Sequence, residues 1–178
     1  MENLCEKVKI IACEVGEYLK TEQQLLNKKD IELKGTRDYV TYIDKEAENR
    51  LINKLKGIFP NSSFLAEEET VEFKETEYTW IIDPLDGTTN YVHGDSPYSV
   101  SIALKHENEI VLGVVYDPLA DQMFSAISKG KAYLNGSLLE VSQHATLKNA
   151  YIGFGIPYKL DEQGEQLLKN AAEQFRNS

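Results

Sequence analysis

The sequence is poor in cysteine, in long apolar runs and in positive charge. Its two cysteines, Cys5 and Cys13, fall on one expected helix. Eight helical residues span about 12 Å, which is too far for a disulfide, so we expect reduced thiols and a cytoplasmic protein. No uncharged apolar segment approaches the roughly 20 residues of a membrane span. Glu2, Glu6 and Lys7 occupy the place where a signal peptide would have its apolar core.

The shortage of positive charge excludes a further set of partners. Against 19 Lys and Arg residues stand 29 Asp and Glu residues, which gives a net charge of −10. Such a chain is unsuited to nucleic acid and to anionic membranes, and we expect neither as a partner. An anionic substrate would need a cation in the site. The 178 residues, 42% of them hydrophobic, suffice for one domain, or for one domain and part of a second.

Hydrophobic periodicity predicts three helices. Apolar residues at three- and four-residue spacing indicate an amphipathic helix over 2–26. Residues 28–40 are polar and irregular, and we expect a loop there. Thr41 is placed to cap a second helix, which ends near Gly57. A third helix is expected over 161–176.

Between the second and third helices the apolar period changes to that of strands. Asn135-Gly136 between two apolar runs predicts a two-residue hairpin. Helices followed by a meander of strands and a further helix favour an α+β fold, with an antiparallel sheet that helices cover on at least one face. The expected strands are 63–66, 78–83, 97–104, 109–117, 121–127, 131–134, 138–141 and 149–154.

The most informative segment joins carboxylates to a glycine and two threonines. Pro84 stiffens the chain after an apolar strand, so that Asp83, Asp86 and the Leu85 carbonyl can converge. Such hard oxygen ligands select Mg²⁺ or Mn²⁺ rather than zinc. Gly87 permits a positive φ, and a helical turn from Thr88 would direct free N–H groups at an anion.

A turn with a helix cap is the alternative interpretation of the same residues, because Asp-Gly-Thr is common in turns. Two further acids favour the metal site. Glu67 ends an earlier short strand and can lie beside Asp83, and Asp44 lies near the start of the second helix. Carboxylates crowded in this way repel one another unless a cation neutralises them.

Three stretches resemble the inositol monophosphatase family. They are Leu65–Glu68, Trp80–Gly94 and Gly113–Pro118; Lys129–Gly136 fits the family too, and the likeness extends to about residue 155. Ala66 stands where the family usually has glycine. The resemblance implies the N-terminal part of a layered α/β sugar-phosphatase fold, and Mg²⁺-dependent hydrolysis of a phosphate monoester, foremost inositol monophosphate, by a metal-activated water.

The resemblance also implies a role for individual residues. They would bind Mg²⁺, activate the attacking water or hold the substrate phosphate. These are Glu67, Asp83, Asp86, Thr88 and the Leu85 carbonyl around the metal ions, Asp44 with Thr88 for the water, and the amides of Gly87 and Thr88 for the phosphate.

Family members continue into a second α/β half, in which a Trp-Asp pair completes the second metal site. The only tryptophan here is Trp80. We therefore expect residues 1–178 to be an N-terminal metal-binding phosphatase domain without that half, weakly active or inactive. Two alternatives stay open: a nucleotide or sugar-bisphosphate phosphatase of the same fold, and a non-catalytic metal-binding or dimerisation module. The expected partners are a small phosphorylated polyol and further copies of the chain.

Overall fold

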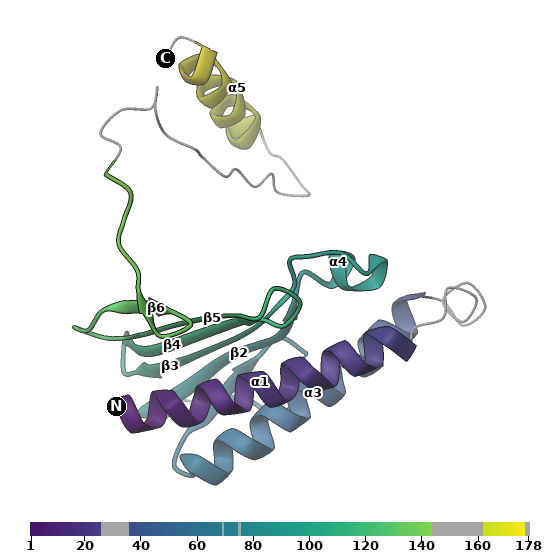
Figure 1. Ribbon diagram of the computed structural model, residues 1–178, viewed down its shortest axis with the longest axis vertical. Coiled ribbons are helices and arrows are strands. Elements are labelled where there is room, and N and C mark those ends of the chain that lie inside the picture. Colours follow the sequence, from purple (N-terminus) through teal and green to yellow (C-terminus); the bar gives the residue numbers. More distant parts are fainter. Residues whose placement is uncertain (26–35, 69, 75, 144–161, 177–178) are drawn as a thin grey trace. The chain divides into compact units, whose positions relative to one another are not determined.

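The computed structural model describes residues 1–25, 36–68, 70–74, 76–143 and 162–176. The chain divides into two compact units, Met1–Leu139 and Glu140–Ser178. The described part of the first unit holds two long helices, a short helix and a seven-stranded sheet (Figure 1). No helix in the described segments is long and apolar enough to cross a membrane.

The strands of the sheet lie in chain order from one edge to the other. β1 is parallel to β2, and every later pair of neighbours is antiparallel. The predicted antiparallel sheet is therefore confirmed from β2 onward, and its one parallel pair lies at the β1 edge. The bounds are β1 Ser63–Ala66, β2 Tyr78–Asp86, β3 Ser99–His106, β4 Glu109–Asp117, β5 Gln122–Ile127, β6 Ala132–Leu134 and β7 Ser137–Leu138.

Helices α1 (Glu2–Leu25) and α3 (Thr36–Ile58) cover one face of this sheet (Figure 1). α1 contacts β3, β4 and β5, and α3 contacts β2. The close fit depends on Gly16, because a Cβ there would lie 2.7 Å from the Tyr116 ring. The predicted first helix is confirmed to within a residue. The second begins at Thr36 rather than at Thr41, so the predicted loop is wrong for residues 36–40.

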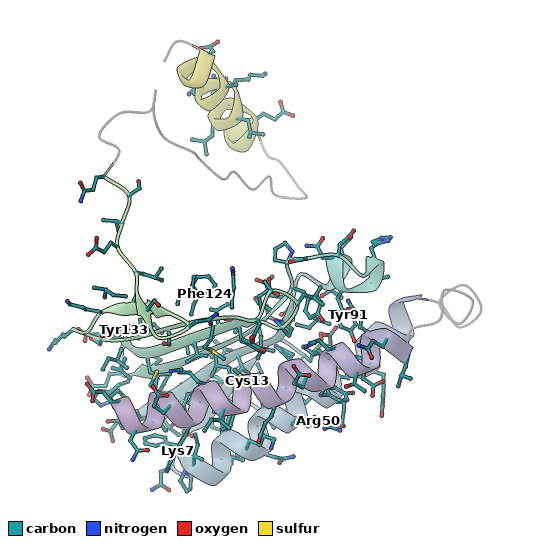
Figure 2. The ribbon with its side chains drawn as sticks, viewed as in Figure 1. Lys7, Cys13, Arg50, Tyr91, Phe124 and Tyr133 are labelled. Carbon is teal, nitrogen blue, oxygen red and sulfur yellow. The ribbon has the colours of Figure 1, made fainter. Side chains whose placement is uncertain are left out.

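The core lies between these helices and the sheet. Leu51 of α3 and Trp80 of β2 are fully buried in it. Tyr91, in the short helix α4 (Thr88–His93), lies near α1 (Figure 2), and its hydroxyl donates to the Leu19 carbonyl at 2.9 Å. The Arg50 guanidinium of α3 lies 4.0 Å from the centre of the Tyr18 ring of α1 and links the two helices.

The predicted hairpin at Asn135-Gly136 is present between β6 and β7. Both residues have a positive φ, 49° and 80°, as a two-residue hairpin of type I′ requires. In the second unit, α5 (Glu162–Arg176) confirms the predicted last helix. The strand predicted over 149–154 lies outside the described residues.

Candidate metal and phosphate site

The end of β2 brings two aspartates and a carbonyl together. β2 continues to Asp86, so its predicted end at Asp83 is wrong. Its pairing with β3 is irregular between Asp83 and Asp86, and such a bulge tolerates Pro84, which has no N–H for the ladder. One Asp83 carboxylate oxygen accepts a hydrogen bond from the Leu85 N–H at 3.1 Å. Asp83 is half-buried and Asp86 is exposed.

Gly87 allows the chain to turn from β2 into α4. Its φ of 92° and ψ of 34° lie in the left-handed region that favours glycine. A Cβ at Gly87 would also lie only 2.8 Å from the Pro97 carbonyl oxygen. α4 begins at the next residue, and the Thr88 hydroxyl donates to the Leu85 carbonyl at 3.2 Å. The left-handed turn and the helical start predicted here are therefore present.

Glu67 reaches the same edge of the sheet from β1. Because β1 and β2 are parallel, their carboxyl ends lie at one edge, with Ala66 opposite Ile82. Glu67 and Asp83 directly follow these two residues, so that the charge of Glu67 acts on Asp83. Burial, and after it the charge of Glu67, raise the pKa of Asp83.

Asp44 approaches the carboxylates from α3. It is 7% exposed. Burial, and after it the charges of Glu68, Asp83 and Glu67, raise its pKa from 3.8 to about 7. Asp86 in turn contributes to the raised pKa of Asp83. The structure therefore brings the four predicted acids Asp44, Glu67, Asp83 and Asp86 into one electrostatic neighbourhood at the end of β2.

The donor chemistry of this neighbourhood fits Mg²⁺. Its side chains offer oxygen atoms only, which hard cations prefer, and a cation would neutralise the repulsion that raises the pKa of Asp44. Within the described ranges, no three or more His, Cys, Asp or Glu side chains are grouped closely enough to hold a metal ion.

Sequence reasoning missed one acid next to this neighbourhood. Glu48 of α3 is 0% exposed, and it accepts hydrogen bonds from the backbone N–H groups of Glu68 and Thr70. The sequence does contain a signal, because Glu48 lies four residues after Asp44 on a helix face that also buries Ala47 and Leu51. A charged residue at such a core position needs partners.

A separate groove of about 420 Å³ lies elsewhere in the first unit, between α1 and strands β5 and β6. Glu2, Cys5 and Tyr133 are among its lining residues, and none of the predicted site residues is. His93, at the end of α4, is exposed. The candidate site is therefore the carboxylate edge and not the groove.

Comparisons with known proteins identify the family to which the chain is similar. The model of the "Inositol monophosphatase family" matches residues 2–178. The fructose-1,6-bisphosphatase/inositol-1-monophosphatase of Aquifex aeolicus is 38% identical over 160 residues, which are 88% of this chain and 61% of that protein. Inositol monophosphatase 2 of Solanum lycopersicum is 46% identical over 129 residues, which are 70% of this chain and 49% of that protein.

A solved structure is similar to this chain in its fold. The extragenic suppressor protein suhB of Bartonella henselae superposes with a TM-score of 0.79 at 32% identity, over 97% of this chain and 67% of that one. The chain spans 61% and 49% of the length of the two curated relatives named above. With a family model matched over residues 2–178, the chain belongs to the inositol monophosphatase family.

Proposed function

We propose that the chain carries the metal- and phosphate-binding part of a Mg²⁺-dependent phosphatase that hydrolyses phosphate monoesters, with inositol monophosphate as the foremost substrate. The single observation that carries this proposal is the gathering of Asp44, Glu67, Asp83 and Asp86 at the end of β2. The names of the relatives support the substrate class.

In this proposal, Glu67, Asp83, Asp86 and the Leu85 carbonyl would hold Mg²⁺. Bound there, the cation would neutralise phosphate charge and make water a stronger nucleophile. The cation would favour the charged form of Asp83, whose pKa is raised by burial and by the charges of Glu67 and Asp86. The acidic surface would then admit an anionic substrate at this one place.

Asp44 and Thr88 would orient the attacking water and take its proton. A general base works best when its pKa lies near the working pH, and in the metal-free protein burial and the neighbouring charges raise the pKa of Asp44 to about 7. The Thr88 hydroxyl is held toward the Leu85 carbonyl. The amides of Gly87 and Thr88, at the start of α4, would bind the phosphate.

We further propose that these 178 residues by themselves bind one Mg²⁺ and turn over substrate slowly. The resemblance places a further aspartate, and the groups that hold substrate hydroxyls, in a part of the family that this chain does not match. Without them the second metal would have Asp83 and Asp86 as its only charged ligands. We expect the chain to form homo-oligomers in the cytoplasm, and light scattering on the purified protein tests the oligomeric state.

A phosphate-release assay tests the function. Inositol monophosphate, a sugar bisphosphate and a nucleotide are compared with and without Mg²⁺, using this chain and any longer product of its reading frame. Loss of activity in Asp83→Asn, with activity kept in the exposed control Asp95→Asn, is the expected result. A preference for the sugar bisphosphate would favour the second candidate, which the name of the Aquifex relative supports. Mg²⁺ binding without turnover in the longer product would favour a non-catalytic module.

A further inference from the structure

We propose that Glu48 is a positioning residue, which holds the segment after β1 so that Glu67 is presented to a divalent cation. The inference rests on the proposed function, because it takes Glu67 as a metal ligand. Glu48 itself binds no cation in this proposal. It acts through the backbone of the residues that follow Glu67.

Three short hydrogen bonds join Glu48 to this segment. One carboxylate oxygen accepts from the Glu68 N–H at 2.7 Å. The other accepts from the Thr70 N–H at 2.9 Å and from the Thr70 hydroxyl at 2.6 Å. Hydrogen bonds to an ionised acceptor are stronger than neutral ones. The two oxygens of Glu48 thus hold the chain directly after Glu67 and again two residues later.

Because Glu48 is completely buried, breaking its hydrogen bonds to the segment after β1 would be costly. Glu48 is 0% exposed, and a buried carboxylate without hydrogen-bond partners is strongly destabilising. If the segment moved away from α3, three donors and one carboxylate would lose their partners together. The segment and Glu48 therefore fix each other.

The position of Glu48 on α3 links the segment to Asp44. Residues four apart on a helix lie on the same face, one turn from each other. Asp44 meets the acidic neighbourhood from one turn of α3, and Glu48 meets the backbone after Glu67 from the next. One helix face thus sets the distance between the proposed base and a proposed metal ligand.

Such a device is needed because the proposed ligands repel one another. The charge of Glu67 acts on Asp83, and Glu67 is next to Glu68 in the chain. Before a cation binds, this repulsion favours a conformation in which the exposed Glu67 swings into solvent. Hydrogen bonds from Glu48 oppose that movement, as partners of metal ligands do in other sites.

The test measures Mg²⁺ affinity in the full 178-residue chain by calorimetry, below its melting temperature. Glu48→Ala should weaken Mg²⁺ binding about tenfold. Thr70→Val, which removes only the hydroxyl bond, should weaken it less. Glu46→Gln is the matched control, because it removes one charge from the same helix outside these bonds, and its affinity should match that of the wild type. Amide exchange at Glu68 and Thr70 should quicken in the Glu48 variants.

The affinities of the wild type and of the Glu48 variants distinguish a failure of this inference from a failure of the proposed function. If the wild type binds no Mg²⁺, the proposed function is wrong, and so is the inference, which depends on it. If the wild type binds and Glu48→Ala stays within about twofold of it, the inference is overturned while the function stands. A lower melting temperature with unchanged affinity overturns it too. If Glu48→Ala does not fold, unchanged affinity in both Glu48→Gln and Thr70→Val decides against it.

Discussion

Removing the charge of Asp44 should stabilise the metal-free protein. Asp44 is buried, and the charges of Glu67, Glu68 and Asp83 surround it. In the unfolded chain the same carboxyl is solvated and ionises with its ordinary pKa. We therefore predict that Asp44→Asn raises the free energy of unfolding at alkaline pH, although most substitutions of buried residues lower it.

The size and the pH range of this effect follow from the pKa of Asp44. Its folded pKa of about 7 lies above the unfolded value of 3.8, so the folded state binds the proton more tightly and stability falls as pH rises between these values. At about 1.4 kcal/mol for each pH unit, the loss reaches an upper limit of about 4 kcal/mol above pH 7. At high pH, Asp44→Asn should abolish this loss of stability. Below the unfolded pKa of 3.8, Asp44 is protonated in both states, so the substitution should change stability little.

Urea unfolding in the presence of a chelator measures the prediction, at about pH 9 and about pH 4. Asp44→Asn should have the higher midpoint at the alkaline pH only, and Asp95→Asn, at an exposed site, should match the wild type at both. Saturating Mg²⁺ should stabilise the wild type more than Asp44→Asn. An Asp44→Asn chain that is less stable than the wild type at alkaline pH would refute the electrostatic reasoning.

Three further predictions concern the turn, the thiols and the core. Gly87→Ala should cost about 3 kcal/mol and Gly94→Ala about 1 kcal/mol in urea unfolding, since both have a positive φ but only the first would meet a backbone oxygen; equal costs would contradict the close approach. Burial raises the pKa of the Cys5 and Cys13 thiols, so alkylation near neutral pH should be much faster in urea than in buffer, and equal rates would contradict this. Leu51→Ala, at a fully buried position, should cost about 3 kcal/mol, and a change under about 1 kcal/mol would show a looser core.

The sequence predicted the hairpin and the order of the strands from local signals, but the strand expected over 138–141 is only Ser137–Leu138, and the strand expected over 97–104 is Ser99–His106. Alternating apolar residues and Asn135-Gly136 define the meander from β3 to β7 without help from distant contacts. The start of α3 was harder to predict, since both Thr36 and Thr41 can cap a helix. The end of β2 was misplaced because Pro84 reads as a strand end, while the bulge opposite β3 accommodates it.

In the candidate site, too, features that depend on neighbouring residues could be predicted, and features that depend on distant contacts could not. The turn at Gly87 follows from residue types within a few positions, and so do its left-handed φ and the start of α4. Glu48 could not be assigned from its neighbours. Its partners lie 20 and 22 residues away in the chain, and only the folded arrangement of α3 and the segment after β1 brings them together. A buried position with a charged residue was the one available hint.

The central claim is that acids from α3, β1 and β2 gather around one divalent cation. Its most direct test is nuclear magnetic resonance of the labelled chain with substoichiometric Mn²⁺, which broadens signals close to the ion. We predict selective broadening at Asp44, Glu67 and Asp83–Thr88, reversed by excess Mg²⁺. Broadening centred elsewhere, or spread evenly over the acidic surface, would contradict the site and the function built on it.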